Sequence, residues 1–203
     1  QGDKGTPDVG INKADYFTSH GYIYVSINYR LSPDVTHPTH VEDVAAAVSW
    51  VLENIDDYGG NPAHLYLMGH SAGAQLAALV ATDEHYLAAQ DHALSELSGV
   101  ILLDGTGYDI PLSLGGQFFL PDRILQMYAD AFGTDPVVWS DASPVTHVAS
   151  GKGIPPFLIL YTGRVAAEVE AGELTSLLLK SDVPAWTYPV SYTHLTLPTK
   201  RIV

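Results

Sequence analysis

Residues 65–73 read Leu-Tyr-Leu-Met-Gly-His-Ser-Ala-Gly, and an alanine- and leucine-rich segment follows them as far as Thr82. The four apolar residues at the start predict a short strand, and residues 74–82 predict a helix. Glycine at positions 69 and 73 permits a sharp, strained turn that a Cβ atom would obstruct. Strand, sharp turn and helix in that order lift a serine hydroxyl above the edge of a sheet. Ser71 is therefore the candidate nucleophile.

The start of the predicted helix indicates how negative charge would be held beside this serine. The backbone N–H of Ala72 lies at the positive end of the helix dipole, where it can stabilise an oxyanion. The alternative interpretation is a serine that only caps a helix after a glycine turn. The strand-turn-helix order favours the nucleophile.

The rest of the chain alternates between strand and helix patterns. Residues 22–29 are rich in β-branched and aromatic side chains and predict a buried strand. Residues 39–55 repeat apolar side chains at helical spacing after a capping-box pattern formed by Thr39 and Glu42, until the glycines at 59 and 60 stop the helix. Two further apolar runs, residues 100–103 and 156–161, predict buried parallel strands. Residues 168–180 predict another helix.

This alternation predicts an α/β protein with a doubly wound, mostly parallel sheet. Residues 105–152 hold aromatic side chains among glycine and proline, and we interpret them as a cap or substrate-wall insertion. A length of 203 residues with 46% hydrophobic content fits one domain.

Composition excludes several classes of function. The 23 acidic and 9 basic residues give a formal charge of −14, which disfavours nucleic acid and anionic lipid as partners. Without cysteine there is no thiol nucleophile and no disulfide. No apolar run reaches the roughly 18 residues that span a bilayer. The compartment is left open, with a soluble, cytoplasmic location favoured over secretion.

Four motifs together resemble one esterase group of the α/β-hydrolases, the group that includes feruloyl-esterase-like, kynurenine-formamidase-like and hormone-sensitive-lipase-like enzymes. The motifs are residues 28–33 (Asn-Tyr-Arg-Leu-Ser-Pro), 40–44 (His-Val-Glu-Asp-Val), 58–62 (Tyr-Gly-Gly-Asn-Pro) and 69–73. The resemblance covers residues 2–184. It implies a carboxylesterase with a serine, aspartate and histidine triad, a small-molecule ester substrate and no cofactor.

In that family a His-Gly-Gly-Gly stretch precedes a segment like Gly2-Asp3-Lys4 and completes the oxyanion hole. The stretch is missing here, so the resemblance implies that the first strands of the sheet lie before residue 1. We therefore expect a hydrolase domain over residues 1–189 that lacks these strands.

The family places its catalytic acid after the strand that ends at Tyr161, where this chain has no acidic residue before Glu168. Glu168 is accordingly the predicted acid and Glu170 the next candidate, although either is more often a solvated residue on a helix face. Asp104 is the runner-up, because some hydrolases of this fold carry the acid after the preceding strand. The alternative for Asp104 is a turn-forming aspartate before Gly105.

The family places its histidine after the last strand, and His194 stands near that position. Residues 190–203, however, resemble a translated transposase sequencing adapter, so we exclude them from the fold. The catalytic histidine, the last loop and the last helix would then lie beyond the chain, and we expect the chain alone to be nearly inactive. His70 is expected to line the site or pack, and His37, His40 and His147 show no metal-ligand spacing.

Three alternative functions stay open. An arylformamidase would share the machinery and differ in its pocket. A catalytically dead α/β-hydrolase that acts as a binding module is suggested by the missing acid. A lipid-interface enzyme would need an exposed apolar lid, for which residues 118–120 (Phe-Phe-Leu) give the one indication.

Overall fold

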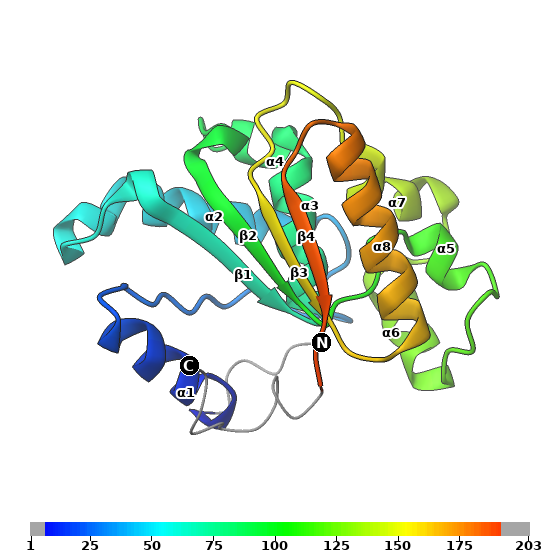
Figure 1. Cartoon of the computed structure of the whole chain (residues 1–203). Coiled ribbons are helices and arrows are strands. Elements are labelled where there is room, and N and C mark those ends of the chain that lie inside the picture. The colour runs from blue at the N-terminus through cyan, green and yellow to red at the C-terminus, as the bar shows by residue number, and fades with distance from the viewer. Residues whose placement is uncertain (1–6, 192–203) are drawn as a thin grey trace.

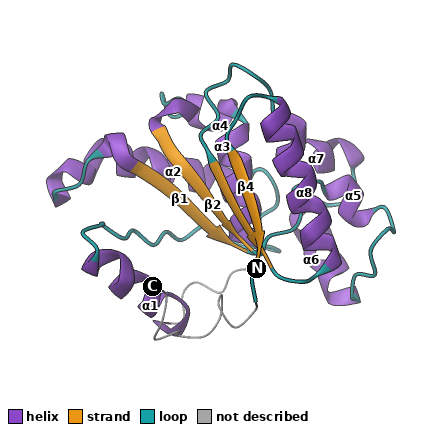
Figure 2. Ribbon diagram, in the orientation of Figure 1, coloured by secondary structure: helices purple, strands orange, loops and turns teal. Residues whose placement is uncertain are grey.

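The computed structural model describes the backbone of residues 7–191 and the side chains of residues 13–191 (Figure 1). Its centre is a four-stranded sheet in the order β1-β2-β3-β4, in which every neighbouring pair is parallel. The predicted α/β class and parallel sheet are confirmed. The strands are β1 (Leu65–His70), β2 (Leu97–Leu103), β3 (Phe157–Tyr161) and β4 (Ala185–Pro189), and their arrowheads converge at one edge in Figure 2.

Three helices pack with the sheet around one apolar core: α2 (Thr39–Asn54), α3 (Ala72–Thr82) and α8 (Val165–Lys180). Parallel strands in the order of the sequence, joined by right-handed crossovers, place their connections on the same face of a sheet. Side chains on that face, such as Leu102, Phe157 and Ile159, are almost fully buried. The strands predicted at residues 100–103 and 156–161 therefore lie where their apolar composition requires.

The opposite face of the sheet is much less covered in the described residues. The strand register aligns Met68, Ile101, Leu158 and Trp186 in one row across it. Trp186 is 50% exposed and Tyr66, in the next row, is 52% exposed. The second helical layer of a doubly wound sheet is thus not seen within residues 7–191.

The prediction of a strand at residues 22–29 is wrong. The chain there has no regular secondary structure, and Tyr22, Ile23 and Val25 are exposed. A strand needs a neighbour that completes its hydrogen-bond ladder, and the described residues pair β1 with β2 alone. Only Ile27 and Tyr29 pack against the core. The β-rich composition of this segment was insufficient without that neighbour.

The helix predicted at residues 39–55 is confirmed, but its capping box is wrong. Pro38 is the N-cap residue and makes no side-chain capping bond, so Thr39 is already inside α2. After Asn54 the chain tightens into a 3₁₀ turn, and Gly59 ends that turn with φ 78°. The predicted stop at these glycines is therefore confirmed.

The insertion between β2 and β3 forms three α-helices and one 3₁₀ helix, and its α-helices lie beside α8 in Figure 1. Among the described residues, no helix is both long and apolar enough to cross a membrane. The remaining elements are α1 (Pro7–Ser19), η1 (Ile55–Tyr58), η2 (Pro62–His64), α4 (Glu84–Ala88), η3 (Leu94–Glu96), α5 (Ile110–Leu114), α6 (Asp122–Phe132), α7 (Pro136–Asp141) and η4 (Pro144–His147).

Candidate active site

Ser71 lies on the sharp turn between β1 and α3. Its backbone angles are φ 54° and ψ −121°, in a region that residues other than glycine seldom adopt. Glycine is required at position 69, because a Cβ atom there would overlap the carbonyl of Gly73 and lie 2.7 Å from the nitrogen of Ala74. A Cβ atom on Gly73 would meet nothing within 4 Å. The predicted strand, turn and helix are confirmed, and the first glycine is the one that packing demands.

The backbone of Ser71 is fixed from both sides. Its N–H donates to the carbonyl of Leu103 at 3.0 Å, and its own carbonyl accepts from the N–H of Ala74 at 2.9 Å. The residue itself is exposed. The serine therefore stands at the carboxyl edge of the parallel sheet, which is the edge where such sheets bind ligands.

Ala72 is the first residue of α3, an eleven-residue helix. The N–H groups in the first turn of a helix have no acceptor within the helix. They also lie at the positive end of the helix dipole. The N–H of Ala72 therefore belongs to the residue directly after the serine, at the positive end of the helix.

Asp104 follows β2 at the same edge of the sheet and is buried, with φ 46°. Its Oδ1 accepts from the Thr162 N–H at 2.9 Å and from the Thr162 hydroxyl at 2.8 Å. Its Oδ2 lies 3.0 Å from a guanidinium nitrogen of Arg164. Burial alone would raise the pKa of Asp104, but the Thr162 and Arg164 donors outweigh it and hold that pKa below its usual value. Asp104 is therefore a buried, charged carboxylate.

Glu168 and Glu170 occupy different environments on α8. Glu168 is exposed in the first turn of the helix. Glu170 is fully buried, so it is not the solvated residue that a helix face suggests. Its Oε2 accepts from the N–H groups of Gly107 at 2.7 Å and Tyr108 at 2.8 Å, and its Oε1 accepts from the Ser113 hydroxyl at 2.5 Å. Glu170 therefore anchors the loop after β2.

One side-chain bond ties the insertion to α3, and others lie within the insertion. The buried side chain of Gln75 donates from Nε2 to the carbonyl of Ala142 at 2.7 Å. The hydroxyl of Tyr128, on α6, lies 3.4 Å from the Thr106 hydroxyl and 3.3 Å from the Ser113 hydroxyl. The Gln75 bond joins the insertion to the helix that follows Ser71, whereas the Tyr128 contacts brace the insertion internally.

Three of the histidines named in the sequence analysis have side-chain partners other than Ser71, and His70 is its direct neighbour in the chain. His70 is exposed, and desolvation together with the nearby charge of Lys13 lowers its pKa. His194 lies outside the described residues. The partners of these three histidines are Asp141 for His37 (2.8 Å), the Ser32 hydroxyl for His40 (2.9 Å) and Asp83 for His147 (3.2 Å).

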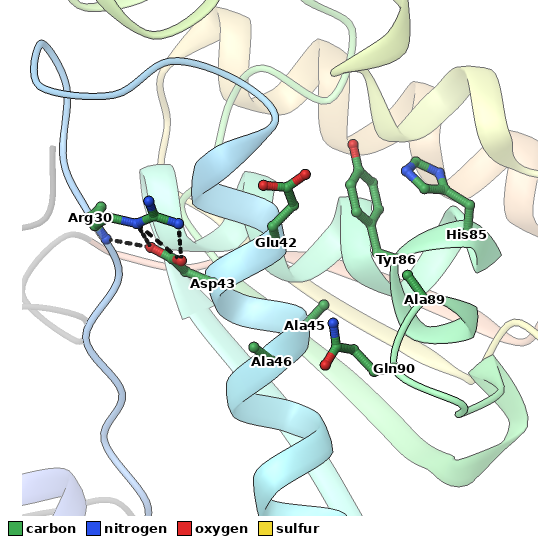
Figure 3. Close-up of a pocket in the computed structure, with 9 residues that line it drawn as sticks. All are labelled: Arg30, Glu42, Asp43, Ala45, Ala46, His85, Tyr86, Ala89 and Gln90. Carbon is green, nitrogen blue, oxygen red and sulfur yellow. Dashed lines mark hydrogen bonds and ion pairs between the residues drawn. The ribbon is translucent and has the colours of Figure 1, made fainter.

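A cavity of about 380 Å³ lies between α2 and α4, and it does not include Ser71 (Figure 3). One wall is the ion pair of Arg30 and Asp43, whose closest atoms are 2.7 Å apart. This pair joins residues 28–33 to residues 40–44, two of the four motifs in the sequence. These two motifs thus meet in space, and Ser71 is not among the residues that line the cavity beside them.

Two features of the site were missed from the sequence. Thr162 and Arg164 together hold Asp104, although they stand almost sixty residues from it in the chain. The buried role of Glu170 was also missed. The one sequence signal for the first contact is that residues 104 and 162 both directly follow apolar strand patterns, and the ends of neighbouring parallel strands meet at one edge.

Known proteins support this interpretation of the turn and the sheet. The sequence matches the BD-FAE family over residues 1–100. It is 36% identical over 149 residues to the esterase LipQ of Mycobacterium tuberculosis, a match that covers 70% of this chain and 34% of LipQ. It is 38% identical over 88 residues to the kynurenine formamidase of Meyerozyma guilliermondii, covering 42% of this chain and 31% of that protein.

The fold is shared with solved esterases. The hyperthermophilic esterase of the archaeon Pyrobaculum calidifontis superposes with a TM-score of 0.76 at 23% identity, over 94% of this chain and 64% of that one. The chain spans about a third of the mycobacterial relatives, 34% of LipQ and 33% of the probable carboxylic ester hydrolase LipM. The serine turn, the parallel sheet and these relatives agree, and the chain belongs to the carboxylesterase family of α/β-hydrolases, of which it spans a part.

Proposed function

We propose that the full-length protein hydrolyses carboxylic esters through an acyl-enzyme formed on Ser71. The observation that carries the proposal is the backbone of Ser71, held at φ 54° between the end of β1 and the start of α3. A serine in that conformation stores strain, and such strain persists where surrounding structure imposes it for function. The esterase relatives support the choice of an ester as substrate.

The reaction follows from this placement. The Ser71 hydroxyl oxygen attacks the ester carbonyl while a histidine takes its proton, and the negative charge moves to the carbonyl oxygen. The N–H of Ala72 donates to that oxygen. The tetrahedral intermediate then expels the alcohol, which receives the proton from the histidine. Water attacks the acyl-enzyme by the same route and releases the acid and free Ser71.

Residues 1–203 alone are proposed to hydrolyse esters at a small fraction of the full-length rate. Within residues 7–191, the structure places no histidine in hydrogen-bond contact with the Ser71 hydroxyl. Loss of one member of a triad leaves a residual acceleration of roughly 10³ to 10⁴ over water, and only where the oxyanion hole and binding site are intact. A clear rate from the pure 203-residue chain, abolished by Ser71→Ala, would contradict this part of the proposal.

A second candidate is an arylformamidase, supported by the similarity to the kynurenine formamidase. The same acyl transfer would then cleave a formamide. The insertion is proposed to act as a substrate wall, and its aromatic side chains, such as Tyr128 and the 96% exposed Phe119, would favour an apolar or aromatic substrate for either reaction. Comparing kcat/KM for an aryl acetate ester and for N-formylkynurenine in the full-length protein separates the two candidates.

The test of the main proposal is covalent labelling of the full-length protein with a fluorophosphonate, beside a Ser71→Ala variant. Labelling of the wild type alone, together with hydrolysis of p-nitrophenyl esters, is the expected result. A folded wild-type protein that takes no label would refute the proposal. That outcome would favour a catalytically inactive binding module of the same fold.

A further inference from the structure

Three neighbouring strands deliver Ser71, Asp104 and Thr162 to one edge of the sheet. The N–H of Ser71 donates to the carbonyl of Leu103 at 3.0 Å, so the backbone of the serine lies beside the residue that precedes Asp104. Resting on the proposed hydrolase function, we propose that Asp104 is a positioning residue: its carboxylate receives the N–H of the catalytic histidine and orients that ring toward Ser71.

The two oxygens of Asp104 are used unequally, as this role requires. Oδ1 is fully engaged by the N–H and the hydroxyl of Thr162. Oδ2 has the guanidinium of Arg164 as its partner at 3.0 Å. A carboxylate oxygen accepts about two hydrogen bonds, so Oδ2 keeps room for one more donor. Thr162 thus fixes the carboxylate from one side and leaves the other oxygen to a histidine.

The surroundings keep Asp104 charged, and a charged acceptor is what stabilises an imidazolium. The charged groups near it are Arg164 on the loop after β3 and His70 on β1, which also feels Lys13. Arg164 is half exposed, with 51% of its side chain accessible. The same guanidinium nitrogen also donates to the backbone carbonyl of Asp104 at 2.8 Å. Because the Arg164 side chain reaches solvent, it can turn about that bond and admit a second donor to Oδ2, whereas the buried Thr162 is held at Oδ1 by both its N–H and its hydroxyl.

The other carboxylates fit the role less well. Glu168 is exposed on α8, and the structure shows nothing that fixes its carboxylate. Glu170 has both oxygens engaged with the loop after β2. Among the carboxylates that the structure describes, Asp104 alone combines burial, a fixed orientation and a place beside the serine turn. The strained φ of 46° at this position is a second departure from relaxed backbone at the same edge of the sheet.

The test compares Asp104→Asn with the wild type in the full-length protein. Asparagine tolerates a positive φ, and its carbonyl oxygen can keep both bonds from Thr162. Its amide nitrogen then replaces Oδ2, so a donor faces the histidine N–H and the wrong tautomer is favoured. The matched control is Asp182→Asn, because Asp182 is also an aspartate with positive φ (60°) but is exposed at the far end of α8.

We expect Asp104→Asn to lower kcat for a p-nitrophenyl ester roughly 10⁴-fold, with the fold intact by circular dichroism and the Asp182→Asn control unchanged. The acid limb of the kcat/KM profile should also shift to lower pH, because a histidine that loses a neighbouring negative charge has a lower pKa. A merely structural role would not move that limb. A folded Asp104→Asn with near wild-type kcat, or a Glu168→Gln variant that loses more activity, would overturn the role of Asp104.

Two further results have a clear meaning: an Asp104→Asn variant that does not fold, and a wild type without activity. If Asp104→Asn does not fold, Thr162→Val removes one donor to Oδ1 at almost constant volume, and kcat should fall several-fold at unchanged KM. An unchanged kcat in folded Thr162→Val overturns the inference. A wild type that neither labels with fluorophosphonate nor hydrolyses ester refutes the proposed function, and with it the inference, whereas normal labelling with an active Asp104→Asn refutes the inference alone.

Discussion

The buried carboxylate of Glu170 provides a quantitative test of how the loop after β2 is held. In Glu170→Leu the N–H groups of Gly107 and Tyr108 lose their acceptor inside the protein, and so does the Ser113 hydroxyl. A buried donor left without a partner costs about 1–3 kcal/mol. Two backbone donors and one adaptable hydroxyl therefore predict a loss of about 3–5 kcal/mol in the free energy of unfolding, a large share of the about 5–15 kcal/mol typical of a folded protein.

Glu170→Gln should behave very differently. Its amide oxygen can still accept from both N–H groups, and the Ser113 hydroxyl can turn to accept from the amide nitrogen. The charge that is costly to bury disappears at the same time, so the expected loss is about 1 kcal/mol or less. Urea unfolding of the full-length protein, followed by tryptophan fluorescence, measures both variants. Glu168→Leu is the matched control on the same helix, and we expect it to stay within about 0.5 kcal/mol of the wild type.

The same residue makes a prediction about pH. Burial raises the pKa of Glu170 above its usual value, although its hydrogen bonds favour the charged form. The folded state then binds the proton more tightly than the unfolded state, so this contribution to stability is present at low pH and is lost as the pH rises through the folded pKa. The wild type should gain stability relative to Glu170→Gln as the pH falls toward the unfolded pKa. Equal losses in the leucine and glutamine variants, with neither loss changing with pH relative to the wild type, would refute this account.

Three further predictions concern the site and its wall. Gly69→Ala should cost about 1–3 kcal/mol and abolish fluorophosphonate labelling, because its Cβ overlaps the start of α3, whereas Gly73→Ala should remain folded; thermal unfolding and labelling of both variants check this. Gln75→Leu should cost about 1–3 kcal/mol and speed proteolysis within residues 105–152, because a buried carbonyl of the insertion loses its donor; an unchanged cleavage rate would contradict it. Arg164→Gln should raise the pKa of Asp104, since it removes a donor and a positive charge, and a carboxylate NMR titration that shows no rise would argue against the ion pair.

The serine turn could be predicted because its determinants are local. A strand pattern, a glycine that packing demands at position 69 and a good helix former directly after Ser71 all lie within a few residues. The strand predicted at residues 22–29 failed for the opposite reason, since a strand is completed by its neighbours and not by its own composition. Helix α2 was predicted from its apolar period, but its first residue was not, because Pro38 and not Thr39 takes the N-cap position.

The candidate acid also depends on contacts between residues that are distant in the sequence. The sequence order pointed to Glu168, because the family places its acid on the segment after Tyr161. That prediction stays untested, and the structure brings Asp104 against Thr162 and Arg164, contacts that join residues almost sixty positions apart. One sequence cannot reveal such a pairing, because it depends on which parallel strands become neighbours and in which register. The burial of Glu170 escaped for the same reason.

The half-covered face of the sheet has a consequence for handling the 203-residue chain by itself. The row of Met68, Ile101, Leu158 and Trp186 presents apolar side chains to water on a rigid surface. Contiguous apolar surface of this kind causes proteins to aggregate and to bind fluorescent hydrophobic dyes. Purified alone, the chain should bind such a dye strongly, elute from gel filtration as concentration-dependent aggregates and stay dispersed only in mild detergent.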